Sequence, residues 1–299
     1  MFDTVIEMLS YPFMTRAFLV GSLVALCSAL LGVSLVLKRY SMIGDGLSHV
    51  GFGAMAIAAA MNAAPLTIAI PVVIVAAILL LRISGNAKIK GDAAIALIST
   101  TSLAVGVMVI SLTTGMNTDV YNYMFGSILA MSAEDVKLSL VLSVFVLILF
   151  IVFYHKIFAI TFDETFARAT GVKAGVYNTL IAVLTAVTIV LGMRMMGALL
   201  ISSLIIFPAL TSMRVCRTFK SVIINAAVIS VVCLIAGVTL SYVAATPAGA
   251  SVVLASNLGL LFVVFLPVVL PDSFLKSLSL CLALSLLSPS YSLRLSRPS

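Results

Sequence analysis

The stretch that decides the fold is residues 221–271, which read SVIINAAVISVVCLIAGVTLSYVAATPAGASVVLASNLGLLFVVFLPVVLP. This stretch contains no Asp, Glu, Lys, Arg or His. A helix needs roughly 20 apolar residues to cross a bilayer, so the stretch is long enough to cross twice. Residues 246–249, Thr-Pro-Ala-Gly, form the natural break, because proline lacks an N–H group and glycine permits a turn. The stretch therefore predicts two consecutive membrane-spanning helices.

Uninterrupted apolar runs fill most of the remaining chain. They cover residues 17–37, 50–64, 65–81, 93–118, 138–154, 174–193 and 195–213. Together the runs predict an all-α polytopic membrane protein with eight or nine transmembrane helices, in which residues 1–271 form a single transmembrane domain. Of the 299 residues 63% are apolar and 9% are charged, whereas a soluble domain carries about a quarter charged residues. This composition excludes a soluble enzyme. Residues 272–299 form a tail rich in Ser and Leu, to which the sequence assigns no role.

The positive charges predict how the spans are oriented. If Arg16 is placed on the outer side of the membrane, the only other Lys or Arg residues on that side before the tail are Lys137 and Arg194. The inner side then holds Lys38, Arg39, Arg82, Lys88, Lys90, Lys156, Arg168, Lys173, Arg214, Arg217 and Lys220. The positive-inside rule selects this threading. The net charge of +7 therefore indicates topology rather than a nucleic-acid partner.

Two ionisable residues stand at the entry to the small-residue second span. They are Asp45 and His49, within GDGLSH at residues 44–49. At a spacing of four residues they share one helix face and supply half of a divalent-metal site. Oxygen and nitrogen ligands suit zinc, manganese or ferrous iron better than magnesium or calcium. The alternative interpretation is a hydrogen bond between Asp45 and His49, with Asp45 capping the helix. Hydropathy places Asp45 near the inner face.

Two segments do not fit a span. Residues 120–133, VYNYMFGSILAMSA, are too short to cross and are predicted to lie at the outer interface or in an outer vestibule. Residues 157–175, IFAITFDETFARATGVKAG, are polar and are predicted to form a short helix on the inner side. Thr161 or Asp163 is expected to cap this helix, and Gly171 to end it. Such a helix is either a solvated connector or a docking element for a cytosolic partner.

Several catalytic motifs are missing from the sequence. It contains no GxxxxGK[ST] phosphate loop, no GxSxG and no HExxH. The four cysteines form no CxxC pair and are expected to be buried and reduced. We therefore expect the chain not to be an enzyme.

Several motifs, in order along the chain, resemble the membrane-spanning permeases of zinc, manganese and iron importers of the bacterial ABC class. The first is YPFMTRAFLVGSLVALCSALLGVSLVLKRYSMIGDGLSHVGFGA, which is similar to the first two helices of that family, with its Gly-Asp-x-Leu-Ser-His signature. GDAAIALIST, VYNYMFGSIL, FDETFARATGV, GALLISSLIIFPALTS and TPAGASVVL follow in the order that the family shows. The resemblance covers most of residues 10–270.

The resemblance implies a mechanism. Two copies of such a permease pair in the bilayer of the bacterial plasma (inner) membrane. Two cytosolic ATPases bind the coupling helices, which FDETFARATGV resembles in this chain. An extracellular or periplasmic metal-binding protein delivers the ion. ATP hydrolysis, on the separate ATPase subunit, drives alternating access. The cargo is a transported divalent metal, with zinc expected first and manganese or iron as alternatives, and no cofactor is bound permanently.

The resemblance also implies roles for particular residues. Asp45 and His49 match the positions that line the metal path, and Pro208 matches the bend of a later pathway helix. The ATPase contact is expected at Phe162, Asp163, Glu164, Phe166, Ala167, Arg168 and Gly171. Two alternatives remain at this point. One is a secondary cation carrier or channel without an ATPase, and the other is an ABC permease for a siderophore or corrinoid.

Overall fold

The structure is a computed structural model that describes residues 11–84, 91–113 and 133–269. The described residues form helices connected by short turns. These are α2 (Pro12–Leu37), α3 (Ile43–Ala60), α4 (Pro65–Ser84), α5 (Gly91–Leu112), α7 (Ala133–Val152), α8 (Tyr154–Phe162), α9 (Glu164–Ala169), α10 (Ala174–Met196), α11 (Ala198–Val215), α12 (Phe219–Ala244) and α13 (Ala248–Val269). The predicted outer segment, apart from Ala133, and the Ser/Leu-rich tail lie outside the described residues.

Within these ranges, nine helices are long and apolar enough to cross a membrane. This confirms the predicted all-α membrane fold and gives nine candidate spans among the described residues. The charge-free stretch of residues 221–271 divides where expected, since α12 ends at Ala244 and α13 begins at Ala248. Ala245, between them, adopts a left-handed conformation with φ of 50°, which reverses the chain.

The second span is longer than its charge-free run. Residues 50–64 were assigned because they are free of charge, but α3 begins seven positions earlier, at Ile43. Asp45 lies in the first turn of α3, where a carboxylate is favoured by the exposed N–H groups of the helix. Both Asp45 and His49 therefore lie within α3, as their predicted position on one helix face requires.

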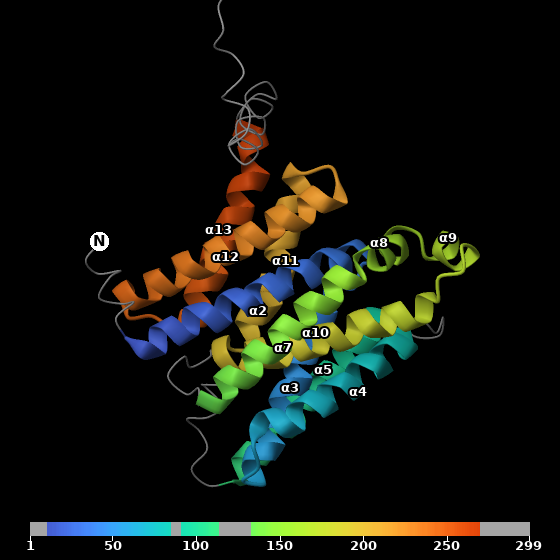
Figure 1. The fold of residues 1–299 in the computed structure, drawn as a ribbon. Coiled ribbons are helices and arrows are strands. Elements are labelled where there is room, and N and C mark those ends of the chain that lie inside the picture. The colour runs from blue at the N-terminus through green and yellow to red at the C-terminus, as the bar shows by residue number, and fades with distance from the viewer. Residues whose placement is uncertain (1–10, 85–90, 114–132, 270–299) are drawn as a thin grey trace, which may run out of the picture.

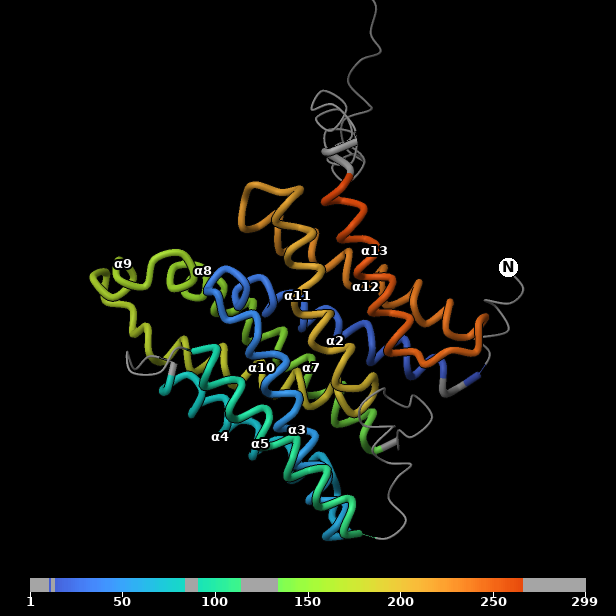
Figure 2. Tube along the Cα trace, turned by 180° about the vertical axis from the view of Figure 1, so that it is seen from behind, coloured from blue at the N-terminus to red at the C-terminus, as the bar shows by residue number. Residues whose placement is uncertain are grey.

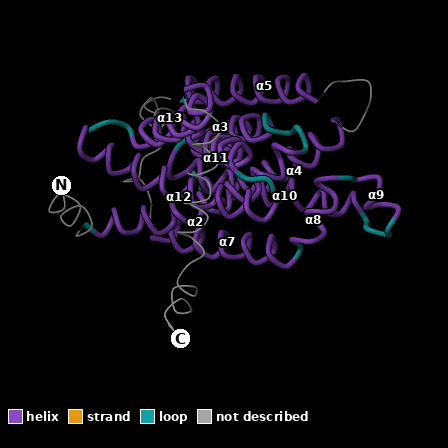
Figure 3. The backbone as a smooth tube through the Cα atoms, turned by 90° about the horizontal axis from the view of Figure 1, so that it is seen from above, coloured by secondary structure: helices purple, strands orange, loops and turns teal. Residues whose placement is uncertain are grey.

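Figure 1 shows α2 crossing the bundle, with α12 and α13 on one side and α3, α4 and α5 on the other. Viewed from behind, α3 lies between α5 and α11, and viewed from above, α5 and α7 occupy opposite edges (Figures 2 and 3). The inner helices α2, α3, α10 and α11 bury most of their spanning residues, whereas α4, α5, α7 and α13 bury fewer than a third of theirs. The exposed side chains of the outer helices are largely apolar, as a lipid-facing surface requires.

Glycine allows two of the inner helices to approach closely. A Cβ atom on Gly32 of α2 would collide with the backbone carbonyl of Ile205 in α11. The side chain of Ile205 in turn packs against Gly44 in the first turn of α3, where a Cβ would lie 3.2 Å from it. Small residues permit such close packing between membrane helices. Ile205 therefore marks one level at which α2, α3 and α11 meet.

A single residue, Gly197, joins α10 to α11. Its backbone angles, φ of 85° and ψ of 162°, lie in a region that glycine adopts far more readily than other residues. Its N–H donates to the carbonyl of Met193, 2.9 Å away, and so closes the last turn of α10. The two helices consequently follow each other without a loop.

Polar and charged side chains form contacts at both ends of α10. Near its start, Asn178 contacts the short helix α9, while near its end Arg194 lies 3.8 Å from Asp135 of α7. At about 1.5 Å per residue, helix α10 is about 35 Å long, which is enough to cross the hydrocarbon core. The two ends of the bundle are thus chemically distinct from its apolar middle.

Candidate functional site

The pair predicted to bind metal lies on one face of α3. Oδ2 of Asp45 and Nε2 of His49 are 3.7 Å apart, which is too long for a hydrogen bond. The Asp45 side chain is 44% exposed and that of His49 is 23% exposed. The expected alternative, a hydrogen bond between the two, is therefore not formed. Asp45 also does not cap α3, whose N-cap residue is Met42.

A third polar group approaches the pair from α11. The Ser202 hydroxyl lies 3.4 Å from Oδ1 of Asp45 and 3.2 Å from the carbonyl of Ala198. Within the described residues, no third His, Cys, Asp or Glu joins the pair to form a cluster. Sequence reasoning missed Ser202. Its only signal was a pair of serines in the otherwise apolar run ALLISSLII.

The metal pair lies beside the interior of the neighbouring helices α2 and α11. Ser202 is close to the start of α11, and about 20 Å of helix separates it from Val215, at about 1.5 Å per residue. Ile205 packs against Gly32, inside α2, and against Gly44, at the start of α3. Residues 38–42 therefore fold back along the bundle, so that α3 begins level with the interior of α2. The depth of Asp45 in the membrane stays a prediction.

The predicted short helix is present as α9, and its cap is the predicted Asp163. Oδ1 of Asp163 accepts hydrogen bonds from the backbone N–H of Phe166 at 2.9 Å and from the hydroxyl of Thr165 at 2.5 Å. The N–H of Phe166, followed by the Thr165 hydroxyl, holds the pKa of Asp163 below its ordinary value. Gly171, with φ of 84°, follows the helix as expected. The other candidate cap, Thr161, instead donates to the carbonyl of Ile157.

The residues predicted to contact an ATPase do not all face outward. Phe162 is 59% exposed and Phe166 is 65% exposed, so both present apolar surface at the end of the molecule. Ala167, in contrast, is completely buried. In the free chain Ala167 therefore holds α9 against the bundle instead of offering a contact.

An aromatic cluster supports this end of the molecule. The rings of Phe158, Phe162 and Phe219 lie within 4.9 to 5.6 Å of one another, and Tyr154 adds a fourth ring 5.7 Å from Phe219. Aromatic pairs at these separations are stabilising. The cluster packs α8 against the first residue of α12. Sequence reasoning missed it because Phe219 is more than fifty positions away from the others.

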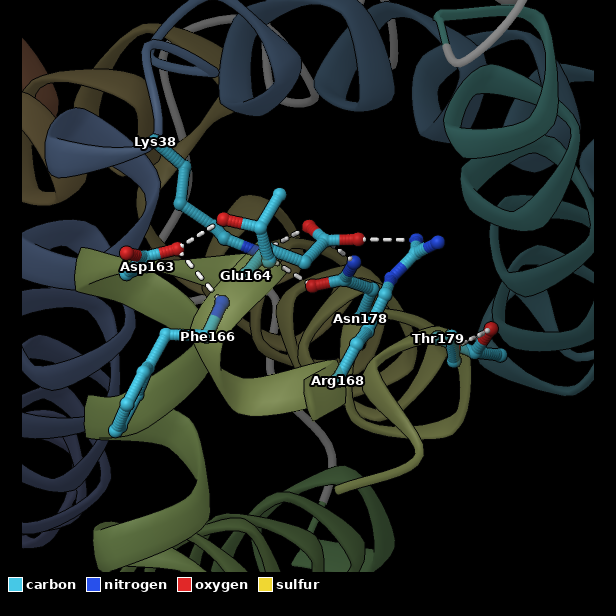
Figure 4. Close-up of polar contacts among 9 residues, drawn as sticks. Lys38, Asp163, Glu164, Phe166, Arg168, Asn178 and Thr179 are labelled. Carbon is cyan, nitrogen blue, oxygen red and sulfur yellow. Dashed lines mark hydrogen bonds and ion pairs between the residues drawn. The ribbon is translucent and has the colours of Figure 1, made fainter. Parts of the chain in front are cut away.

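Glu164 is the centre of a polar network that connects three helices (Figure 4). Its Oε1 accepts from Arg168 at 2.5 Å, one turn along α9. Its Oε2 accepts from the side-chain amide of Asn178 at 3.0 Å and lies 3.6 Å from Nζ of Lys38. Lys38 follows the last residue of α2, and Asn178 lies in α10. The predicted residues Glu164 and Arg168 are therefore brought together, with two partners that sequence reasoning did not identify.

Pro208, the predicted bend of the pathway helix, lies inside α11 and is buried. Proline removes one backbone hydrogen bond from a helix interior, which favours bending there. The role of Pro208 in the pathway stays a prediction.

Comparison with known proteins identifies the family. Residues 10–267 match the ABC 3 transport family. The chain belongs to this family. An ABC transport family does not agree with a secondary carrier that works without an ATPase, so that alternative is set aside. The resemblance to the permeases of metal-importing ABC transporters is confirmed by this match and by the relatives.

The relatives of this ABC 3 family chain carry names for different metals. One is the manganese transport system membrane protein MntC of Halalkalibacterium halodurans, which is 29% identical over 84% of this chain and 86% of its own length. Another is the high-affinity zinc uptake system membrane protein ZnuB of Haemophilus influenzae, which is 31% identical over 80% of this chain and 92% of its own length. Similar identities to both do not decide the metal.

A solved structure shares the fold. PsaBC from Streptococcus pneumoniae in complex with Fab superimposes with a TM-score of 0.79 and 27% sequence identity. The match covers 87% of this chain and 94% of the other. The architecture described above is therefore shared with a solved protein structure.

Proposed function

We propose that the chain is the membrane-spanning permease of an ATP-driven importer of a divalent transition metal ion, with zinc expected first and manganese or iron as alternatives. The observation that carries the metal interpretation is the Asp45–His49 pair. A carboxylate and an imidazole one helical turn apart, partly exposed and not hydrogen-bonded to each other, are free to ligate a passing ion. Family membership and the names of the relatives support this interpretation.

The metal would be held weakly and briefly. Two protein ligands and a nearby hydroxyl are fewer than a tight zinc site uses, and a transported ion has to leave as well as enter. We expect a second copy of the chain to contribute a second pair across the dimer, in the bacterial plasma membrane. Alternating access would then expose the ligands first to an external metal-binding protein and afterwards to the cytosol.

The direct test is metal uptake into vesicles that contain the permease together with its ATPase. We expect the double variant Asp45→Asn, His49→Ala to lose uptake by about tenfold or more, because both ligating atoms are removed. The matched controls are Asp92→Asn, which also lies in the first turn of its helix, α5, and His155→Gln, both of which should transport normally. Unchanged uptake in the double variant would favour a larger cargo such as a siderophore or corrinoid. Competition between zinc, manganese and iron would identify the metal.

The ATPase is proposed to dock where α8 meets α9, through Phe162 at the end of α8 and Phe166 in α9, whose exposed rings supply an apolar contact. Interface centres are typically rich in aromatic residues. We expect Phe166→Asp to abolish co-purification of the ATPase while the permease remains folded. The matched control is Val176→Asp, a similarly exposed apolar residue at the start of α10. If the ATPase remained bound to Phe166→Asp, the docking surface would have to lie elsewhere.

A further inference from the structure

Lys38 joins three helices at the end of the molecule that carries α9. Its Nζ contacts the side-chain oxygen of Asn178, in α10, and lies 3.6 Å from Oε2 of Glu164, in α9. Lys38 itself directly follows α2. Figure 4 shows the side chain extending from the end of α2 toward Glu164. Asn178 also donates to Glu164, at 3.0 Å, so the three groups form a closed triangle.

The triangle is largely protected from water. The Lys38 side chain is 10% exposed and that of Glu164 is 34% exposed. Burial lowers the pKa of Lys38, and the charge of Glu164 opposes that shift. Burial would raise the pKa of Glu164, but hydrogen bonds from Asn178 and Arg168 and the charge of Lys38 outweigh it and lower the pKa. Removing the charge of Glu164 would therefore leave the Lys38 ammonium, which is 10% exposed, without an opposite charge, which is costly.

Lys38 also begins the turn that leads to the metal pair. The turn is held by backbone hydrogen bonds, from the N–H of Lys38 to Ser34 at 3.1 Å and from the N–H of Tyr40 to Leu35 at 2.8 Å. The N–H of Ile43, the first residue of α3, donates to Tyr40 at 3.1 Å. Asp45 follows two positions later, within the first turn of α3. A bonded path of a few residues thus connects the ammonium of Lys38 with the carboxylate of Asp45.

We propose that Lys38 is a positioning residue for transport, whose ion pair with Glu164 passes the displacement of α9 to the turn before α3 and so to Asp45 and His49. This inference rests on the proposed docking of an ATPase at α9. Without Lys38, α9 would still be connected to α10 through Asn178 and to α8 through the chain, but its direct link to α2 would be lost. ATP hydrolysis would then continue without moving the metal pair.

The test follows the metal pair without requiring a metal. The probe is a cysteine at Ser202, in a chain whose four native cysteines are replaced by alanine, assembled with its ATPase in nanodiscs. We measure the rate at which a thiol reagent labels this cysteine, with and without ATP. With Lys38 present we expect ATP to change the rate by about tenfold, the size of a typical allosteric coupling. In Lys38→Met the ATP-dependent change should disappear, while ATPase binding and basal hydrolysis persist.

Matched variants distinguish transmission from simple loss of structure. Lys38→Arg keeps the charge and should retain the ATP-dependent change, and Lys156→Met, an exposed lysine of α8, should behave as the parent. Glu164→Gln should reproduce the effect of Lys38→Met, and the double variant should be no worse than either single one, because both remove the same interaction.

Three results would overturn the proposal. The first is an ATP-dependent change that persists in Lys38→Met, and the second is the absence of any change in the parent. The third is loss of the ATPase from Lys38→Met, because Lys38 would then only hold the docking helix in place. The ATP-dependent labelling rate does not depend on the cargo. The link from α9 to Asp45 and His49 could therefore hold even if the proposed metal were wrong. Failure of the ATPase to bind the parent chain would instead contradict the proposed function.

Discussion

At the scale of single residues, Ser202 adds a hydroxyl to a site that otherwise has one carboxylate and one imidazole. Its oxygen lies 3.4 Å from Oδ1 of Asp45. A group at this distance can orient the carboxylate or ligate an ion directly. Ser203, its neighbour in the chain, is buried and donates to Leu200 at 2.8 Å.

We therefore expect Ser202→Ala to raise the KM for metal uptake by about three- to tenfold, because the site loses one oxygen and its orienting contact. The maximal rate should change less. Ser203→Ala provides the control, since it removes a hydroxyl of the same type from the same helix without touching Asp45. Equal KM values for the two variants would show that Ser202 does not contribute to the site.

The cap of α9 has a pH dependence whose sign follows from its hydrogen bonds. Because the N–H of Phe166 and the hydroxyl of Thr165 bind the charged form, the pKa of Asp163 is lower when folded than its ordinary value of 3.8. The stabilisation of α9 by Asp163 is then fully present above that ordinary value, and it is lost as the pH falls through the lowered pKa.

We expect the side-chain carboxyl carbon of Asp163, followed by NMR in detergent, to titrate with a midpoint below 3.8. The Phe166 amide signal should move with the same midpoint, since this N–H donates to the carboxylate. In Asp163→Asn, which retains a capping oxygen without a charge, the midpoint should vanish from the Phe166 signal. A midpoint at or above the ordinary value would contradict the capping interaction.

At the scale of helices, the contact between α2 and α11 depends on Gly32. We expect Gly32→Ala to destabilise the protein by about 1–3 kcal/mol, since the added methyl group would push the backbone of Ile205 away. Thermal unfolding in detergent measures this change. Gly259→Ala is the control, because a Cβ at this position of α13 meets nothing within 4 Å. If both variants melted at the parent temperature, α2 and α11 would not be closely packed.

Local patterns were enough to predict the elements but not all of their ends. Runs of apolar residues predicted the spans, and Asp163 and Gly171 predicted the limits of α9, because hydropathy and capping act over one or two turns. The charge-free run starts later than α3 because a charge-free window cannot include Asp45 or His49. A search for charge-free runs misses the start of a spanning helix when ionisable residues occupy its first two turns.

Contacts between distant segments could not be predicted in the same way. Lys38 and Asn178 are 140 positions apart, and Asp45 and Ser202 are 157 positions apart. Neither the composition nor the periodicity around Lys38 distinguishes it from the other inner lysines, whose charges the positive-inside rule already explains. The metal pair itself was visible because its two members share one helix. The contact of Ser202 with Asp45 and the ion pair of Lys38 with Glu164 could be identified only from the packing of the helices.

At the scale of the whole molecule, the ion pair of Asp135 and Arg194 and the network around Glu164 lie at opposite ends of α10. The charge tally predicts that the Glu164 end faces the cytosol. We expect a membrane-impermeant thiol reagent to label Lys137→Cys in intact cells. Thr170→Cys should be labelled only after the membrane is opened, although both positions are exposed in the structure. The reverse pattern would invert the topology and place α9 outside, beyond the reach of an ATPase.

The junction at Gly197 has a mechanical consequence for the assembled transporter. Helix α10 begins beside the Glu164 network, and helix α11 carries the Ser202 hydroxyl that contacts Asp45. A single residue, Gly197, connects the two helices. Any change of the angle between α10 and α11 is concentrated in the φ and ψ torsions of Gly197, because no loop separates the two helices. A bulkier amino acid at this junction would therefore strain the backbone, because side chains rarely allow a φ of 85°, and would change the angle between α10 and α11.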